Sequence, residues 1–222
     1  MTERVLRVAT WNVHGLRAGV PAAASAIRAE EPDVLLLQES GPRRRLRDLG
    51  RALGWTVSAD PRVFPRRRVQ NALLARPGAA ELIRPRLVRF ARGSPWHPRG
   101  ALIAEVDERW TAVSAHLGLD RRERERHVAE LGSLFEGATR PLVLGADLNA
   151  RPDDPVSRSL AAQLTDVWGQ VGEDDGATFP ATEPTARIDY LFVGPAFQAL
   201  RAWTAGSTAS DHLMVVADLA FD

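Results

Sequence analysis

The segment at residues 32–39 constrains the fold most, because it places four apolar residues in a row, Val34 to Leu37, between polar ones. A short continuous apolar run of this kind is typical of a β-strand that is buried on both faces. The segment at 141–145 repeats the pattern. Together with the helical segments described next, these strands predict an α/β protein with mixed sheets.

Helices are expected at 21–30, at 43–53 and after Asp120, which matches a capping box with Glu123. Asp154 is expected to cap a short helix that starts at Pro155. Further strands are expected at 6–11, 71–75, 82–90, 101–106, 110–116, 186–193 and 213–219. Because no helix interrupts residues 71–116, the four strands of that section are expected to pair antiparallel.

Length and composition exclude several classes of protein. A chain of 222 residues is expected to form one domain, 1–222, and 45% hydrophobic with 26% charged residues is ordinary for a soluble globular protein. The absence of cysteine excludes disulfides, thiolate chemistry and cysteine-based zinc sites. The charged N-terminus lacks the apolar core of a signal peptide and no apolar run is long enough to span a membrane, so we expect a cytoplasmic protein. We also expect a monomer.

Charge adds one further constraint. The formal net charge is +1, so no strong overall field indicates nucleic-acid or membrane binding. All 29 basic residues are arginine. Compositional bias of the genome is the simplest explanation, but arginine is also the side chain best suited to bidentate phosphate binding.

Polar side chains recur at the tips of the expected strands. Glu39, His116, Asp147 with Asn149, and Asp211 with His212 all follow apolar runs, as does Asn12, whereas Asp189 lies inside a strand. Each residue alone is more typical of a turn or helix cap. Charged groups at the ends of buried strands are costly to desolvate unless they are paired or bind metal, so a cluster of them predicts a functional site.

Six segments resemble the signature set of the endonuclease/exonuclease/phosphatase superfamily. They occur in the family's order, from residue 9 to residue 212, as ATWNVHG at 9–15, LQE at 37–39, SAHL at 114–117, GADLN at 145–149, RIDY at 187–190 and SDH at 210–212. The resemblance implies a four-layered α/β sandwich, with two mixed, mostly antiparallel sheets flanked by helices. It also implies Mg²⁺, with Mn²⁺ as a possible substitute, and hydrolysis of a phosphate ester.

The resemblance and the chemistry of phosphoester hydrolysis together assign roles. Glu39 is the best candidate for a metal ligand, with Asn12 beside it and Asp211 as an outer or second ligand, because Mg²⁺ prefers oxygen donors. Asp147 is the candidate for accepting the proton of the attacking water or for orienting that water, and Asn149 would hold the water or a phosphate oxygen if the strand continues.

The two histidines receive different roles. His212 would donate to a phosphoryl oxygen while Asp189 holds its ring in the useful tautomer; some schemes for the family instead make this histidine the general base, and the sequence leaves both open. His116 would contact the phosphate from the other side. His14 stands where several nucleases of the family carry an aspartate that supports the metal.

Arginine clusters supply the candidates for substrate binding. They precede two expected strands, and the expected substrate-binding residues are Arg66, Arg67, Arg68, Asn71 and Arg99. The alternative is that such runs form solvated faces. Trp55 and Trp96 could stack on bases, with core packing as the ordinary alternative.

The sequence therefore favours a divalent-metal-dependent phosphodiesterase that acts on nucleic acid, DNA or RNA, or on a nucleotide-like diester. One alternative is a phosphatase or phospholipase of the same superfamily that acts on inositol phosphates or phospholipid head groups. Another is a catalytically inactive binding domain, which is disfavoured because Glu39, Asp147, Asp189 and His212 are all present.

Overall fold

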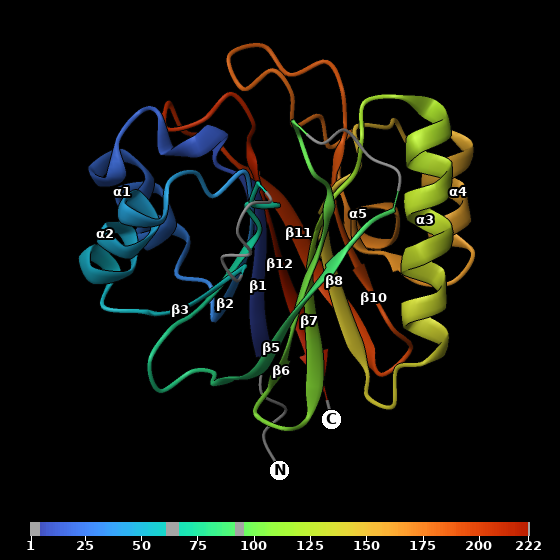
Figure 1. The fold of residues 1–222 in the computed structure, drawn as a ribbon, viewed down its shortest axis with the longest axis horizontal. Helices are drawn as coiled ribbons and strands as arrows, with labels where there is room; N and C mark the ends of the chain where they lie inside the picture. The colour runs from blue at the N-terminus through green and yellow to red at the C-terminus, as the bar shows by residue number, and fades with distance from the viewer. Residues whose placement is uncertain (1–4, 61–66, 92–95, 222) are drawn as a thin grey trace.

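The computed structural model describes residues 5–60, 67–91 and 96–221, which form two six-stranded sheets packed face to face (Figure 1). The first sheet has the order β11 (Phe197–Ala205), β12 (Met214–Phe221), β1 (Val5–Asn12), β2 (Val34–Gln38), β4 (Ala72–Ala75) and β3 (Thr56–Ala59). The second has the order β5 (Leu82–Arg89), β6 (Gly100–Val106), β7 (Trp110–His116), β8 (Leu142–Asp147), β10 (Asp189–Val193) and β9 (Thr165–Asp166). Both sheets are mixed and mostly antiparallel, as the sequence predicts.

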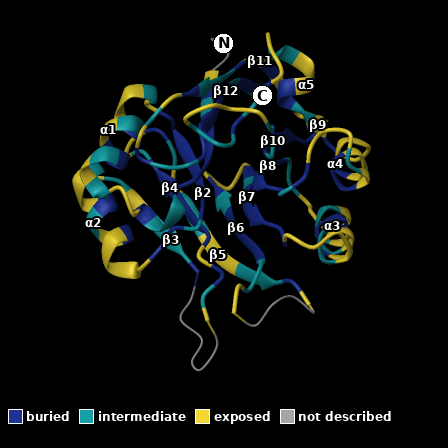
Figure 2. Cartoon of the chain, turned by 90° about the horizontal axis from the view of Figure 1, so that it is seen from above, coloured by how far each residue is buried: buried dark blue, intermediate teal, exposed yellow. Residues whose placement is uncertain are grey.

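Helices cover the outer faces of the two sheets. On one side lie α1 (Val20–Glu30) and α2 (Arg43–Leu53), and on the other lie α3 (Arg121–Glu136) and α4 (Pro155–Ala161), with the short α5 (Val167–Val171) beside β10 and β11. A 3-10 turn, η1 (His14–Leu16), follows β1. Figure 2 shows the exposed residues of the helices on their outer sides, with the buried strands between the helical layers, so the four-layered sandwich is confirmed.

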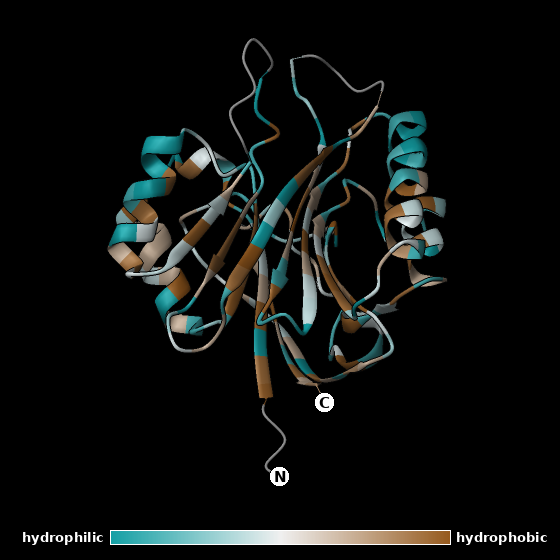
Figure 3. Cartoon of the chain, turned by 60° about the horizontal axis from the view of Figure 1, so that its bottom comes forward, coloured by the Kyte–Doolittle hydropathy of each residue, from teal (hydrophilic) through white to brown (hydrophobic). Residues whose placement is uncertain are grey.

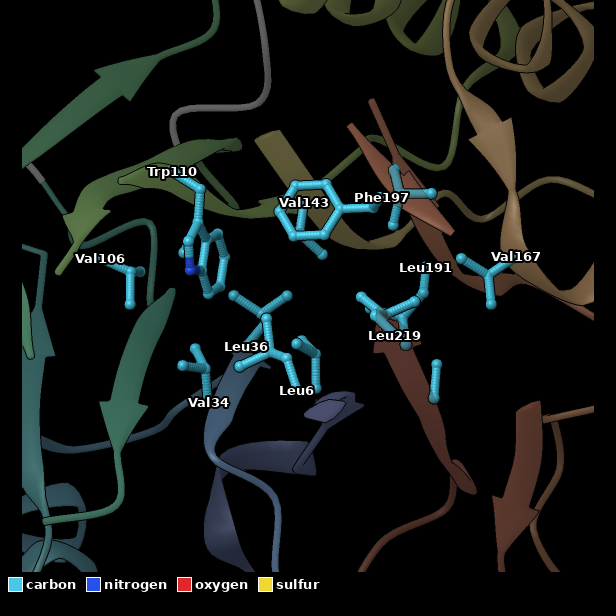
Figure 4. Close-up of a cluster of buried hydrophobic side chains, with 14 of the residues drawn as sticks. Leu6, Val34, Leu36, Val106, Trp110, Val143, Val167, Leu191, Phe197 and Leu219 are labelled. Carbon is cyan, nitrogen blue, oxygen red and sulfur yellow. The ribbon is translucent and has the colours of Figure 1, made fainter. Parts of the chain in front are cut away.

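Strand β2 shows why these sequences make sandwich strands. Successive side chains point to opposite faces, so Val34 and Leu36 enter the core between the sheets, whereas Leu35 and Leu37 pack beneath α1 and α2. All four are fully buried. Figure 4 shows the core between the sheets, where Leu36 of one sheet lies near Val143 of the other. The hydrophilic residues gather on the helices and loops (Figure 3).

The arrangement of strands brings four strand ends to one edge. In the described part of the chain, the parallel pairs are β1 with β2 and β7 with β8, one pair in the middle of each sheet. Their last matched residues are Asn12 with Gln38 and His116 with Asp147. Because parallel strands end at the same edge and the two sheets are stacked, side chains from both sheets converge there.

Some sequence predictions of elements need correction. The strands at 82–116 pair antiparallel in succession as expected, but β4 joins the other sheet and pairs with β2 and β3. Five elements were not predicted: η1, β3, β9, β11 and α5. Strand β11 lacks a simple alternation because a bulge between Ala199 and Arg201 shifts its register.

Candidate active site

Asn12 links the two sheets at the convergent edge. Its Nδ2 donates to Oδ2 of Asp147 at 2.9 Å, and its Oδ1 accepts from the backbone N–H of His14 at 3.0 Å. Asn12 and Asp147 are both buried, at 3% and 1% exposed. The amide therefore fixes one face of the Asp147 carboxylate and ties the end of β1 to the end of β8.

A buried carboxylate orients His212. Asp189 lies opposite Asp147 on the neighbouring strand, and its Oδ2 is 2.8 Å from Nδ1 of His212. The same oxygen accepts from Oγ1 of Thr178 at 2.6 Å. The backbone carbonyl of His212 accepts from the Trp11 indole at 2.9 Å, so both the ring and the main chain of His212 are held.

These contacts favour a charged His212 beside a carboxylate that holds its proton more tightly than usual. Burial opposes charge on His212, but the carboxylates of Asp189, Asp147 and Asp211 raise its pKa to about 9. Burial, followed by the negative charge of Asp189, raises the pKa of Asp147 above its ordinary range. A carboxylate with a raised pKa is a better proton acceptor near neutral pH.

His116 lies on the other side of Asp147 and is neutral. Burial lowers its pKa well below the ordinary value, and the positive charges of Arg99 and His212 lower it further. Arg99 Nη1 lies 2.9 Å from Nδ1 of His116. Because a guanidinium only donates, Nδ1 must accept, which leaves the proton on Nε2. That nitrogen is 3.3 Å from Oδ2 of Asp147.

Asn149 reaches the site through a turn. Strand β8 ends at Asp147, so the expected continuation of the strand is wrong; instead the backbone N–H of Asn149 donates to Oδ1 of Asp147 at 3.0 Å, at a φ of 51°. Its Nδ2 donates to the carbonyl of Leu117 at 3.1 Å and lies 3.2 Å from Nε2 of His116. The side chain is thus fixed beside both Asp147 and His116.

Glu39 lines the cleft beside this group, and Asp211 lies next to His14, another residue of the cleft lining. Glu39 is half-buried directly after β2, and its backbone carbonyl accepts from Gly15 at 2.8 Å. Within the described residues, no donor forms a hydrogen bond with the Glu39 carboxylate. Oδ1 of Asp211 lies 3.3 Å from Nδ1 of His14, which in turn contacts Arg17, so His14 lies between a carboxylate and a guanidinium.

The donor set fits a hard divalent cation. Glu39 and Asp211 supply carboxylate oxygens, which such ions prefer. The tightest group of acidic and histidine side chains in the described residues is Asp147, Asp189 and His212, whose ligand atoms lie within 4.8 Å of one another. Oδ1 of Asp189 is buried there without a hydrogen-bond partner in the described part. A protonated imidazole cannot coordinate a metal, however, so this group binds one only if His212 loses its proton.

A cleft of about 1120 Å³ opens beside these residues, and Glu39 and Arg99 line it. Arg67 and Arg68 also line it, but they differ in their contacts. Arg68 forms an ion pair with the buried Asp60 and donates to the carbonyl of Gly41 at 2.8 Å, so its guanidinium links these two residues. Arg67 lies over the Trp96 ring, 4.8 Å from its centroid. Arg66 lies outside the described residues.

Asn71 lies beneath the cleft. It is fully buried, and its Nδ2 donates to the carbonyls of Gly100 and Ser114 at 2.9 and 2.8 Å. The amide therefore joins the two sheets close to His116. Its contact with a substrate stays a prediction.

The sequence matches the model of the Endonuclease/Exonuclease/phosphatase family over residues 9–212. The chain belongs to this family. Its members are hydrolases that act on phosphoester bonds, which accords with a site of carboxylates and imidazoles at one sheet edge. A comparison with curated proteins gives no match.

Solved structures of the family share the fold. An endonuclease/exonuclease/phosphatase family protein from Bacteroides thetaiotaomicron is 18% identical, with a TM-score of 0.86 and 100% of both chains covered. The mannosyl-6-phosphatase Bt3783 of the same organism is 18% identical, with a TM-score of 0.81 over 97% of this chain and 100% of that one. TDP2 of D. rerio, solved with a single-strand DNA product, is 18% identical, with a TM-score of 0.78 over 98% and 99% of the two chains.

The names of these neighbours span sugar phosphates and DNA, so this family fold does not by itself give the substrate. Among the described residues, no helix is long and apolar enough to cross a membrane.

Two residues of this family member were missed by the sequence analysis. Thr178 bonds Asp189, and the ring of Phe179 lies 4.8 Å from that of His212. Both lie in the loop at 174–184, which the sequence identifies only as rich in turn residues. A threonine in such a loop carries no pattern, and only the fold reveals its partner.

Proposed function

We propose that this protein is a Mg²⁺-dependent phosphodiesterase, with Mn²⁺ as a possible substitute, that hydrolyses nucleic acid or nucleotide-like diesters. One observation carries the proposal: at the convergent ends of both sheets the buried Asp147 carboxylate, whose pKa is raised, lies 3.3 Å from Nε2 of His116 and within 4.8 Å of a ring nitrogen of His212. A base and two differently charged donors are what phosphoester hydrolysis requires.

Asp147 is the residue that takes a proton from the attacking water. The water oxygen forms a bond to phosphorus, its proton passes to the Asp147 carboxylate, and the bond from phosphorus to the leaving oxygen breaks. The leaving oxygen then takes up a proton. The contacts from Asn12 and Asn149 hold the carboxylate in place while it accepts this proton.

His212 donates from its Nε2 to a nonbridging phosphoryl oxygen. Its charge stabilises the negative charge that builds up on the phosphoryl group, and Asp189 keeps Nδ1 as the donor to the protein. A pKa of about 9 supports this role over that of general base, because a base must be deprotonated at working pH.

His116 contacts the phosphate from the other side. The arginine at its Nδ1 leaves Nε2–H as the donor, so the ring can hold an oxygen without carrying a charge. Asn149 lies beside it and orients the same oxygen or the water.

Glu39, with Asn12 and Asp211, is the set of residues that would hold the metal. A bound divalent ion offsets charge on the phosphoryl oxygens and helps to position the phosphate. The Glu39 carboxylate is available for this role because it has no hydrogen bond within the described residues, whereas Asp189 and His212 are engaged with each other.

The charge of the cleft favours a diester with further phosphates over an isolated phosphate. Arginines outnumber carboxylates among its lining residues, which are Arg17, Arg43, Arg67, Arg68 and Arg99 against Glu39, Asp120 and Glu123. An excess of cations around an active site lowers the energy of an approaching polyanion. The proposed substrate is therefore nucleic acid, DNA or RNA.

The test is a substrate panel assayed with Mg²⁺, Mn²⁺ and EDTA. It contains single-stranded DNA, single-stranded RNA, a simple aryl diester, a sugar phosphate, an inositol phosphate and a choline lipid. We expect metal-dependent cleavage of the diesters, with steep salt dependence for nucleic acids. Asp147→Asn should lower kcat/KM by about 10²–10⁴-fold, and Asp48→Asn, a surface carboxylate on α2, serves as the matched control. Hydrolysis of monoesters or lipids alone would overturn the proposal.

A further inference from the structure

Two exposed apolar side chains stand among the charged residues that line the active-site cleft. Four large apolar side chains are exposed within the described residues, and two of them, Trp96 at 65% and Leu119 at 73%, line this single cleft. The other two, Val5 and Leu200, lie on strands β1 and β11. Exposed apolar groups beside a catalytic centre mark a binding surface more often than isolated ones do.

We infer that Trp96 and Leu119 form a subsite for an unpaired nucleobase next to the scissile phosphate, and that Arg67 belongs to it. The inference rests on the proposed diesterase function and specifies its substrate class: single-stranded nucleic acid or a nucleotide diester. Within the described residues, Trp96 and Leu119 lie outside the three clusters of buried hydrophobic side chains.

Arg67 adds a positive charge to the subsite. Its guanidinium lies over the Trp96 ring, 4.8 Å from the centroid, so a cation covers one face of the ring and a base would use the other. A nucleotide presents the matching pair of groups, a flat ring and an anionic phosphate. Aromatic rings beside basic grooves are the usual way in which proteins bind single strands, because every base offers a stacking face.

The position of the subsite connects it to the chemistry. Glu39 and Arg99 line the same cleft as Trp96 and Leu119, and Arg99 contacts the catalytic His116. A diester whose phosphate lies at the catalytic residues therefore extends its next group along the cleft toward the rim. A paired base in a duplex is stacked on its neighbours and does not expose its face, so the subsite selects unpaired strands.

A sugar phosphate fits this rim less well than a nucleotide. A sugar exposes hydroxyls around its ring, which require hydrogen-bond partners when they are buried. The cleft has polar side chains that can bind hydroxyls, but the exposed Leu119 and Trp96 offer apolar contact, which suits the flat face of a base better than a ring of hydroxyls. The inference thus separates this chain from a phosphatase that acts on sugars.

Two substrates with the same leaving group test the subsite. Thymidine 5′-(4-nitrophenyl phosphate) carries a base, and methyl 4-nitrophenyl phosphate does not. For the intact protein with Mg²⁺, we expect kcat/KM to be higher for the thymidine ester. Trp96→Ala should lower the ratio of the two kcat/KM values about 5- to 150-fold, the range of one base–aromatic stacking contact.

Two further variants show whether the effect comes from stacking. Trp96→Phe should keep most of the ratio, because phenylalanine also offers an aromatic face. Leu200→Ala, which removes an exposed apolar side chain from β11, is the matched control for Leu119→Ala and should leave the ratio unchanged. The Leu119→Ala variant should lower the ratio by a smaller factor than Trp96→Ala does.

The outcomes separate the two proposals. If the wild-type protein hydrolyses neither ester with either metal, the diesterase function itself is wrong. If it hydrolyses both at equal rates, and Trp96→Ala leaves the ratio unchanged, the subsite is overturned while the diesterase function stands. If Trp96→Ala and Leu200→Ala lower the ratio of the two kcat/KM values equally, the subsite is also overturned, because a general loss of folding would then explain both effects.

Discussion

His116 and His212 both lie close to the Asp147 carboxylate, yet their surroundings shift the pKa values of the two rings in opposite directions. His212 faces the carboxylates of Asp189 and Asp211, which raise its pKa to about 9 despite burial. His116 meets the guanidinium of Arg99 instead, and burial and that charge lower its pKa well below the ordinary value. The comparison teaches that burial lowers the pKa of both rings, and that the carboxylate at Nδ1 of His212 reverses this effect, whereas the guanidinium at Nδ1 of His116 adds to it.

Replacement of each histidine should separate the two roles most strongly. His212→Asn removes a charged donor and should lower kcat by about 10²–10³-fold, the usual effect of losing one preorganised donor to a developing negative charge. His116→Asn removes a neutral donor and should lower kcat less. Steady-state kinetics on an aryl diester measures both. Equal losses would show that the charge on His212 contributes nothing beyond a hydrogen bond.

Removal of the charge of Asp189 should lower the pKa of His212, so that this ring partly resembles His116. Without the Asp189 charge, burial lowers the pKa of His212, so less imidazolium remains at high pH. We expect the alkaline limb of the pH–rate profile near pH 9 in the wild-type protein and at lower pH in Asp189→Asn. The rate at neutral pH should fall about 10-fold or more. An unmoved alkaline limb would mean that another group causes it.

A change at Arg99 should act on the other ring. Arg99→Leu removes the donor to Nδ1 and the positive charge, so the pKa of His116 should rise but stay below its ordinary value, because burial is the larger cause. The ring should also lose its preference for the tautomer with the proton on Nε2. Ring ¹⁵N chemical shifts of the metal-free protein report both the pKa and the tautomer of His116. Arg67→Leu is the control, since Arg67 contacts Trp96 and not His116.

The smallest expected effect of the difference between the two histidines is on the pH dependence of the free energy of unfolding. The folded pKa of His212 is raised above 6.5, so its contribution is complete below pH 6.5 and is lost as pH rises toward 9. The folded pKa of His116 is lowered, so its contribution is complete above pH 6.5 and is lost as pH falls. In urea unfolding, His212→Asn should flatten the alkaline side of the stability profile and His116→Asn the acidic side. If each variant changes the free energy of unfolding by the same amount at all pH values, this assignment is contradicted.

The sequence predicted the parts of the site that local pattern encodes. Asn12, Glu39, His116 and Asp147 follow apolar strands, and their polar character at those tips is visible without a structure. The sandwich was predicted from the resemblance, which the family match and the fold bear out. What holds these residues together was not predicted, because their partners are distant in sequence.

Arg68 illustrates the limit. From the sequence it is one of three consecutive arginines, each an equal candidate for substrate contact. In the fold, its guanidinium pairs with Asp60 and donates to the carbonyl of Gly41, while Arg67 lies over Trp96. Thr178 and strand β11 are similar cases, since a hydroxyl partner and a bulged strand depend on tertiary contacts.

The most direct test of the account is an NMR titration of the two rings in the metal-free protein between pH 5 and pH 10. The account predicts that His212 is an imidazolium at pH 7 and titrates near pH 9, while His116 stays neutral across that range with its proton on Nε2. A neutral His212 at pH 7, or a His116 that becomes charged near its ordinary pKa, would contradict it.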